Sequence, residues 1–289
     1  MIRHALVQFK PYKSQPDKNL ARLEGILVQL EGEHIDVLTL PETALTGYFL
    51  QAGVREQALT ADEMLGQLQK TVKRSGRTAP LDICLGFYER DGGTFFNSAL
   101  YAEFNTENEG VRHVHRKMFL PTYGVFDEER YVSRGWELKA FDTRFGRAGM
   151  LICEDAWHAS TAAVLALKGA DVLYIPTASP VRDLTGPEPV NAQRWEDTAK
   201  GIAAEHGVYV LTTCLSGFEG GKGFSGMSHM MDPYGNVVAK GKLFDEQIIL
   251  SDVHPESIGA ARYESPLLAD LRANLPELIR AFSEVSVKA

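Results

Sequence analysis

The 289-residue sequence predicts an α/β fold, a four-layer α-β-β-α sandwich in which two mixed β-sheets face each other beneath outer helices. Two observations favour this class: short β-rich runs alternate with helical stretches, and the alternation falls into two halves of the β-α-β kind. No low-complexity segment, repeat or flexible linker separates the halves. We therefore expect one domain over residues 1–254 and a partly helical C-terminal tail, 255–289, that could pack on a partner subunit.

The first half contains strands identified by apolar runs and helices identified by apolar residues three or four positions apart. In order, we expect a strand at 2–9, a helix at 17–33, a strand at 35–42, a helix at 61–76, and strands at 81–90, 94–104 and 111–120. The last two strands should pair antiparallel, because the polar stretch NTENEG (105–110) between them is typical of a turn.

The second half repeats this alternation. In order, we expect two strands around Phe145-Gly146, a helix at 160–170, a strand at 171–178, a helix at 190–207, a strand at 208–218, a hairpin at 226–242 and a strand at 244–254. Gly207 should end the long helix, since glycine readily takes the left-handed backbone conformation found after helices. Asp232, Pro233 and Gly235 favour the hairpin turn.

The composition narrows the class of protein. A formal charge of -8 argues against a nucleic-acid-binding surface, which carries clustered Lys and Arg. No apolar run approaches the ~20 residues needed to cross a bilayer, and the N-terminus lacks the features of a signal peptide. We expect a cytoplasmic protein that does not bind membranes or nucleic acid.

The three cysteines, Cys84, Cys153 and Cys214, are widely spaced and form no CxxC motif. An odd number without a secretion signal argues against a disulfide framework, and no ligand cluster predicts a metal or cofactor site. Cys84 and Cys214 lie inside β-type apolar runs, which favours packing. Cys153 instead ends the run GMLI and precedes two carboxylates, so its own neighbours leave both packing and nucleophilic roles open.

Three predicted strand ends each deliver an ionisable group: Glu42, Lys117 and Cys153. Residues that perform chemistry in α/β proteins gather at such ends. If the three meet, Glu42 can take the thiol proton as a general base, and Lys117 with the Glu154 backbone N–H can stabilise an oxyanion. This set predicts acyl transfer through a thioester. No spacing rule connects the positions, and Glu42 as a cap or Lys117 as a solvated amine remain alternatives.

Three segments resemble the signature blocks of the nitrilase superfamily, the carbon–nitrogen hydrolases. They are LTLPETALTGY (38–48), HRKMFLPTYGVFDEERY (115–131) and GMLICEDAW (149–157). Further matches extend the resemblance over about 2–254. It implies the α-β-β-α sandwich and, for this chain, a carbon–nitrogen hydrolase domain that requires no metal or cofactor.

The resemblance also implies roles for individual residues. Glu42, Lys117 and Cys153 match the family's catalytic triad, and Glu128 in FDEERY matches a second glutamate that orients the lysine or assists water and the leaving group. The alternative for Glu128 is a structural salt bridge with Lys117 or Arg130.

The blocks resemble the glutamine-hydrolysing domain of glutamine-dependent NAD synthetases more than they resemble nitrilases. Nitrilases usually have Trp-Glu after the cysteine, and Glu154-Asp155 stands there in this chain, which favours amide over nitrile hydrolysis. We expect a free-standing amidase or a glutaminase-like subunit, because no synthetase-type Ser-Gly-Gly-x-Asp-Ser loop is present. N-carbamoyl-amine hydrolase and ω-amidase activities are the alternatives within enzymes. A non-catalytic module and a metal-dependent phosphodiesterase are alternatives from other classes.

The residues expected to line a pocket for a small amide lie near the triad: Tyr48, Tyr123, Glu154, Trp157 and Ser179. Arg182 is a weaker candidate for binding a substrate carboxylate. Three histidines near the motifs, His113, His115 and His158, are not family catalytic positions, and we expect solvated loop or strand residues there. The family also implies a homodimer or higher homo-oligomer, for which the apolar helix at 160–170 and the tail are candidate contacts.

Overall fold

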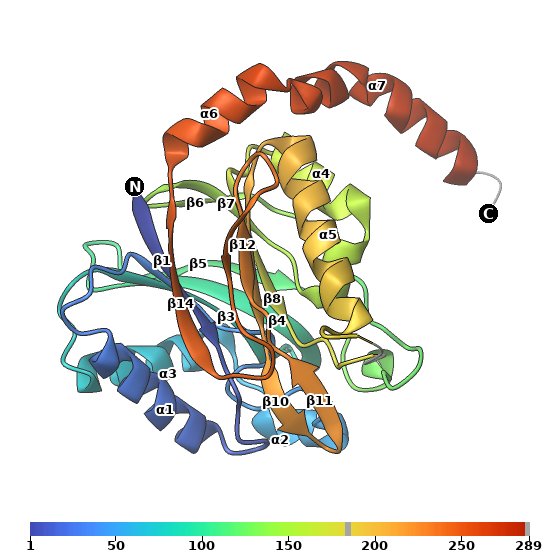
Figure 1. The fold of residues 1–289 in the computed structure, drawn as a ribbon. Coiled ribbons are helices and arrows are strands. Elements are labelled where there is room, and N and C mark those ends of the chain that lie inside the picture. Colours follow the sequence, from blue (N-terminus) through green and yellow to red (C-terminus); the bar gives the residue numbers. More distant parts are fainter. Residues whose placement is uncertain (183–185, 287–289) are drawn as a thin grey trace.

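A computed structural model of the chain describes residues 1–182 and 186–286. Two six-stranded sheets lie face to face at its centre, and helices cover both outer faces (Figure 1). The strand order is β14-β1-β2-β3-β4-β5 in the first sheet and β13-β12-β9-β8-β7-β6 in the second. The predicted four-layer α-β-β-α sandwich is therefore confirmed.

The first sheet is mixed, because β1, β2 and β3 run parallel while its other pairs are antiparallel. Its strands are β1 (Ile2–Gln8), β2 (Val37–Thr39), β3 (Leu81–Asp91), β4 (Thr94–Phe104), β5 (Gly110–Arg116) and β14 (Gln247–Val253). Strand β14 thus returns to pair with β1 and forms one edge of the sheet.

The second sheet has a parallel centre formed by β7, β8 and β9, flanked by antiparallel pairs. Its strands are β6 (Phe141–Thr143), β7 (Gly146–Met150), β8 (Val172–Thr177), β9 (Tyr209–Cys214), β12 (His229–Met231) and β13 (Val237–Lys240). Parallel strands need covered faces, and the two sheets and their helices supply the cover.

Four helices form the outer layers. Helices α1 (Pro16–Gln29) and α3 (Ala61–Arg74) cover the first sheet, and α4 (Ala159–Leu167) and α5 (Val190–His206) cover the second (Figure 1). Helix α3 begins at a capping box, in which the Glu63 N–H donates to Thr60 Oγ1 at 3.1 Å and the Thr60 N–H donates to Glu63 Oε2 at 2.7 Å. As expected, Gly207 ends α5 with φ of 60°.

The chain after β14 forms α6 (Pro255–Glu264) and α7 (Leu267–Ser286), which arch over the sheets and project past α4 and α5 (Figure 1). Helix α6 is tied down by Arg262, whose guanidinium lies 2.8 Å from Asp171. Helix α7 exposes apolar side chains, Leu278, Ile279, Phe282 and Val285 among them. Within the described ranges, no helix is both long and apolar enough to cross a membrane.

Several element predictions were wrong in detail. The strand predicted at 35–42 covers only Val37–Thr39, because Pro41 has no N–H to donate to a neighbouring strand. The strand predicted at 208–218 ends at Cys214. The chain leaves the sheet after Cys214 and forms a separate hairpin of β10 (Ser216–Glu219) and β11 (Lys222–Ser225), in which Gly217 has φ of 87°.

Short helical segments were also not anticipated. They are η1 (Gln51–Gly53), α2 (Val54–Gln57), η2 (Glu128–Arg130) and η3 (Cys153–Trp157). Each is a single turn, too short for apolar periodicity to reveal it.

Candidate active site

The three strand ends meet between the two sheets. Glu42 follows β2 and Lys117 follows β5, both from the first sheet, whereas Cys153 follows β7 of the second and opens η3. The Lys117 ammonium nitrogen lies 2.8 Å from Glu42 Oε1, and both side chains are fully buried. The fold therefore brings together groups that are separated by up to 111 positions in the sequence, from 42 to 153.

Glu42 is held rigidly. Its Oε1 accepts hydrogen bonds from Asn97 Nδ2 at 2.7 Å and from Lys117 at 2.8 Å, and its Oε2 accepts the Ala178 N–H at 2.7 Å. Gly86 allows this arrangement, because a Cβ at that position would lie 2.5 Å from the Glu42 Cα. The carboxylate is thus fixed by contacts from both sheets.

Lys117 lies between two carboxylates. Its Nζ is also 2.8 Å from Glu128 Oε1, and the Tyr48 hydroxyl donates to that same oxygen. Burial lowers the pKa of Lys117, but Glu128 and Glu42 outweigh it and raise the pKa well above its ordinary value. Burial raises the pKa of Glu128 to about 7. The site therefore holds a permanent cation beside a carboxyl group that titrates near neutral pH.

The geometry shows which cation Glu128 pairs with. The ion pair with Lys117 is present, whereas Arg130 lies 3.6 Å from Asp127 instead. Glu128 Oε2 is buried and has no hydrogen-bond partner in the described part of the chain. A salt bridge alone does not explain this unpaired buried acceptor.

Cys153 is the first residue of a tight turn and has φ of 45°, in the left-handed region that few side-chain-bearing residues adopt. Burial raises the pKa of its thiol well above the ordinary value, and Glu42 raises it further, while Lys117 and the Ala178 N–H act in the opposite direction. The resting group is therefore a thiol, and a base must remove its proton before it can attack.

Asp155 connects the lysine and cysteine segments, a role that the sequence did not predict. Its fully buried carboxylate accepts N–H groups from Met118 at 2.9 Å and Phe119 at 3.0 Å, directly after Lys117. It also accepts the Ile152 N–H at 3.0 Å, directly before Cys153. One carboxylate thereby fixes the spacing between strand ends that belong to different sheets.

The fourth partner of Asp155 is His115, which was expected to be solvated. His115 Nε2 lies 2.9 Å from Asp155 Oδ2, and this histidine is buried, not solvated as predicted, because its strand position faces the second sheet. His113 is partly buried, and burial lowers its pKa to about 4. His158 stacks on Phe119 with ring centroids 3.7 Å apart. None of the three contacts the triad directly.

A cavity of about 430 Å³ opens onto Cys153. Four of the five predicted pocket residues line it: Tyr123, Glu154, Trp157 and Ser179. Tyr48 does not. It lies behind Glu128, beside a separate cavity of about 50 Å³, because its hydroxyl is turned toward the carboxylate.

The cavity carries charge of both signs. The Tyr123 hydroxyl donates to Glu154 Oε2 at 2.9 Å. The Arg182 guanidinium lies 5.4 Å from the Tyr123 ring, and that of Arg194 lies 5.0 Å from the Trp157 ring. Neither arginine pairs with a carboxylate within residues 1–182 and 186–286. These groups can recognise a substrate that is itself charged.

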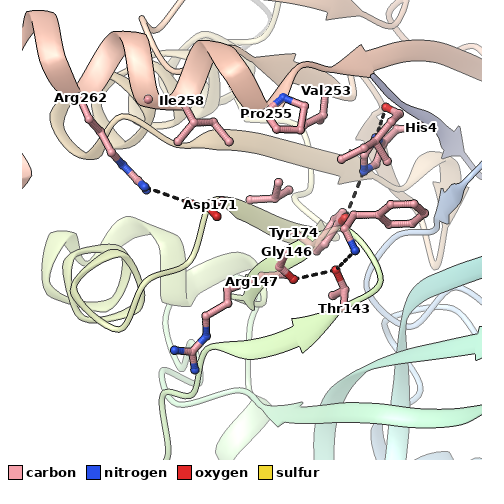
Figure 2. Close-up of a pocket in the computed structure, with 15 residues that line it drawn as sticks. His4, Thr143, Gly146, Arg147, Asp171, Tyr174, Val253, Pro255, Ile258 and Arg262 are labelled. Carbon is pink, nitrogen blue, oxygen red and sulfur yellow. Dashed lines mark hydrogen bonds and ion pairs between the residues drawn. The ribbon is translucent and has the colours of Figure 1, made fainter. Parts of the chain in front are cut away.

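A second cavity, of about 250 Å³, lies at the other end of the strands (Figure 2). It is lined by the first residues of β1, β7 and β8 and by α6, so it opens away from the triad. His4 and Tyr174 meet there at 3.1 Å, and the Arg262–Asp171 ion pair borders it (Figure 2). Burial lowers the pKa of His4 to about 4, which leaves the ring neutral.

For the part of the chain that the structure describes, no three His, Cys, Asp or Glu side chains are grouped so as to hold a metal ion. The sandwich, the buried Glu42–Lys117 pair and a cysteine that lines the adjacent cavity are the features expected of a hydrolase that acts on carbon–nitrogen bonds. The chain belongs to the carbon-nitrogen hydrolase family, whose sequence model matches residues 3–263.

Known relatives agree with this assignment. A citrullinase from Francisella tularensis subsp. tularensis is 26% identical over 295 residues, which cover 97% of this chain and 99% of that protein. A glutamine-dependent NAD(+) synthetase from Acinetobacter baylyi is 25% identical over 86% of this chain but 43% of its own length. A solved carbon-nitrogen hydrolase from Helicobacter pylori G27 shares the fold, with a TM-score of 0.82 at 24% identity over 94% of this chain and 96% of that one.

Proposed function

We propose that the protein hydrolyses a carboxamide to a carboxylic acid and ammonia through a thioester on Cys153. The observation that carries the proposal is the buried contact of Lys117 with both Glu42 and Glu128 beside the cavity onto which Cys153 opens. A nucleophile, a base and a fixed cation then face one bound substrate.

Acylation begins when Glu42 takes the Sγ proton and the thiolate attacks the amide carbon. The carbonyl oxygen becomes an oxyanion, which the Lys117 ammonium and the Glu154 backbone N–H stabilise. When the tetrahedral intermediate collapses, the carbon–nitrogen bond breaks and the protonated Glu42 gives its proton to the departing nitrogen. Ammonia leaves, and the acyl group remains on Cys153.

Deacylation reverses these proton movements. Glu42 takes a proton from water, and the resulting hydroxide attacks the thioester carbon. The carbon–sulfur bond breaks, the acid leaves and Cys153 regains its proton. Glu128 supports both steps by holding the Lys117 ammonium in place, and its open Oε2 is available to the water or the departing ammonia.

We further propose that the substrate carries a carboxylate next to an amino group, as in the side-chain amide or ureide of an α-amino acid. Arg182 and Arg194 supply positive charge at the cavity, and the Glu154 carboxylate supplies a partner for an ammonium group. Two relatives, a citrullinase and a glutamine-dependent NAD(+) synthetase, have names that refer to such amino acids, citrulline and glutamine. ω-Amidase, N-carbamoyl-amine hydrolase and ammonia-supplying glutaminase activities are the alternatives.

The test is ammonia release and intact mass, measured with a panel of amides that differ in charge. Glutamine and citrulline should turn over at least about tenfold faster than uncharged aliphatic amides or nitriles, the effect of about one charged contact. They should also turn over faster than dicarboxylate monoamides, which lack the amino group and would be preferred by an ω-amidase. A Cys153-linked acyl adduct should appear in the intact mass. Faster turnover of uncharged amides would reject the substrate class, and ammonia release by Cys153→Ala would reject the thioester.

We also propose that the protein is a cytoplasmic homodimer or higher homo-oligomer. The exposed apolar side chains of α7, including Ile279 and Phe282, support this, since exposed apolar patches commonly mark protein contacts. Light scattering at micromolar concentration should give at least twice the 31.9 kDa chain mass. A monomeric mass would contradict the proposal.

A further inference from the structure

Glu219, on the β10–β11 hairpin outside both sheets, contacts the segment that follows Glu42. Its side chain is buried, and its two oxygens accept consecutive backbone N–H groups. Oε2 accepts from Tyr48 at 2.9 Å and Oε1 accepts from Phe49 at 2.5 Å. A buried carboxylate bound in this bidentate way fixes the position of the backbone it touches.

The segment is shaped to receive this carboxylate. Gly47 has φ of 82°, and a Cβ there would lie 2.7 Å from Glu219 Oε2, so the close approach requires glycine. On the other side, the Tyr88 hydroxyl donates to the Tyr48 carbonyl at 2.6 Å. The backbone of Tyr48 is therefore held at both its N–H and its C=O.

Tyr48 in turn contacts the proposed catalytic machinery. Its hydroxyl donates to Glu128 Oε1, the oxygen that Lys117 also contacts, and the Lys117 ammonium lies 5.7 Å from its ring. A path of direct contacts thus runs from Glu219 through the Tyr48 backbone and side chain to Glu128. No other carboxylate in the described residues accepts the Tyr48 or Phe49 N–H groups.

We propose that Glu219 is a positioning residue for the hydrolysis: it fixes the Tyr48 backbone, so that the Tyr48 hydroxyl stays on Glu128 and Glu128 stays paired with Lys117. The proposal rests on the proposed function of the triad. The alternative is a purely structural role, in which Glu219 only attaches the hairpin to the body of the protein.

A double-mutant cycle separates these two roles. Glu219→Ala should lower kcat/KM by about 10- to 100-fold, the effect of losing a hydrogen bond to a charged group, with the larger share in kcat. If Glu219 acts through Tyr48, the same substitution in a Tyr48→Phe background should cost less than about threefold, because the hydroxyl is already absent. Equal costs in both backgrounds would overturn the proposal.

Further variants keep the test decisive. If Glu219→Ala fails to fold, Glu219→Gln, which replaces one acceptor oxygen, is measured in the same cycle. Its loss of kcat/KM should be smaller than that of Glu219→Ala and should appear in the wild-type background but not in Tyr48→Phe. Glu103→Gln is the matched control, since Glu103 is also buried but lies on β4 of the first sheet and pairs with Arg112 of β5 at 3.1 Å. It should leave kcat/KM within about twofold. A comparable loss in the control would also count against Glu219.

The pH profile provides a readout that attachment of the hairpin would not move. The titratable groups around Glu128 are Lys117, Glu42, Tyr48, Tyr88 and Cys153. Burial raises the pKa of Glu128, and the Lys117 and Tyr48 hydrogen bonds oppose that rise. In Glu219→Ala, the acid limb of kcat/KM should therefore move to higher pH by at least about 0.5 unit. An unshifted limb with reduced activity would assign Glu219 a structural role, whereas persistent activity in Cys153→Ala would reject the triad itself.

Discussion

Two buried polar clusters lie between the same two sheets and differ in how completely their groups are paired. The catalytic cluster contains Glu42, Lys117, Glu128 and Cys153. The second, which we call the structural cluster, consists of His4, Asp82, Tyr101, Arg144 and Tyr174. Tyr101 donates to Asp82 Oδ2 at 2.7 Å, Arg144 lies 2.8 Å from Asp82 Oδ1, and both His4 nitrogens have partners.

The catalytic cluster leaves hydrogen-bonding capacity open. Glu128 Oε2 is buried without a partner among the described residues, and so are Asn97 Oδ1 and Thr43 Oγ1 of two residues beside Glu42, whereas no atom of the structural cluster is. The backbone also differs between the two clusters. Cys153, and Thr43 next to Glu42, have positive φ values of 45° and 50°. The structural cluster has Asp82, Tyr101 and Tyr174 on regular strands. Burial and charge are common to both clusters. Open acceptors and strained backbone distinguish the one that we expect to react.

The largest difference between the clusters should appear on removal of the nucleophile. Cys153→Ala should lower kcat by at least about 10⁴-fold, as loss of a covalent nucleophile does in other enzymes, with little change in melting temperature. Cys84→Ala is the control, since Cys84 packs against Met150 in the same core. It should retain activity and lose about 1 kcal/mol of unfolding free energy. Ammonia-release assays and thermal melts measure both.

Removal of the central cation should affect both activity and stability. Lys117→Met leaves Glu42 and Glu128 buried without their counter-ion, so we expect a loss of about 3–5 kcal/mol in unfolding free energy. Without the oxyanion donor, kcat should fall about 10³-fold. Arg144→Met removes the cation of the structural cluster and should reduce stability alone. A comparable loss of kcat in Arg144→Met would show that the two clusters are not functionally distinct.

Substitution of Asp155, which connects the segments that contain Lys117 and Cys153, should lower kcat by less than the changes above. Asp155→Asn keeps the size of the side chain but replaces one acceptor oxygen with a donor that faces backbone N–H groups. We expect kcat to fall about 10- to 100-fold and unfolding free energy to fall by about 1–3 kcal/mol. Unchanged kcat with reduced stability would mean that the spacing of Lys117 and Cys153 tolerates this change.

The smallest effect concerns pH and the structural cluster alone. Burial raises the pKa of Asp82 to about 6, against an unfolded value near 3.9. The folded state then binds this proton more tightly, so the wild type loses stability as pH rises from about 4 to 6. Relative to the wild type, Asp82→Asn should gain about 1–3 kcal/mol over this interval, measured by urea unfolding at each pH. A constant difference would contradict the raised pKa, and kcat should be unaffected.

Much of the fold could be predicted from the sequence, because long strands and helices carry their own periodicity. The strand-end positions of Glu42 and Cys153 followed from apolar runs that stop at them. Lys117 lies inside the strand predicted at 111–120, which in the structure ends at Arg116 and so leaves Lys117 directly after it. Asp155 and Glu219 could not be assigned in the same way. Their partners are backbone N–H groups at distant positions, and a backbone amide has no signature in the sequence.

The predictions also failed where the chain leaves regular structure. The β-type run of 208–215 is followed by only two non-apolar residues, Ser216 and Gly217, before Phe218, so the predicted strand was carried past the point at which β9 gives way to β10. Tyr48 was expected at the pocket wall because it follows Glu42 closely. It lies behind Glu128 instead, because the positive φ of Gly47 redirects the chain there.

The left-handed backbone of Cys153 has a consequence for protein engineering. Glycine adopts this conformation without strain, so Cys153→Gly should relieve about 1–2 kcal/mol of backbone strain, which offsets the loss of a buried side chain. Selection for thermal stability alone would therefore not retain the nucleophile. A mutant library designed to raise thermal stability should therefore keep position 153 fixed or be screened for turnover, since the backbone at this residue favours glycine and the proposed reaction requires cysteine.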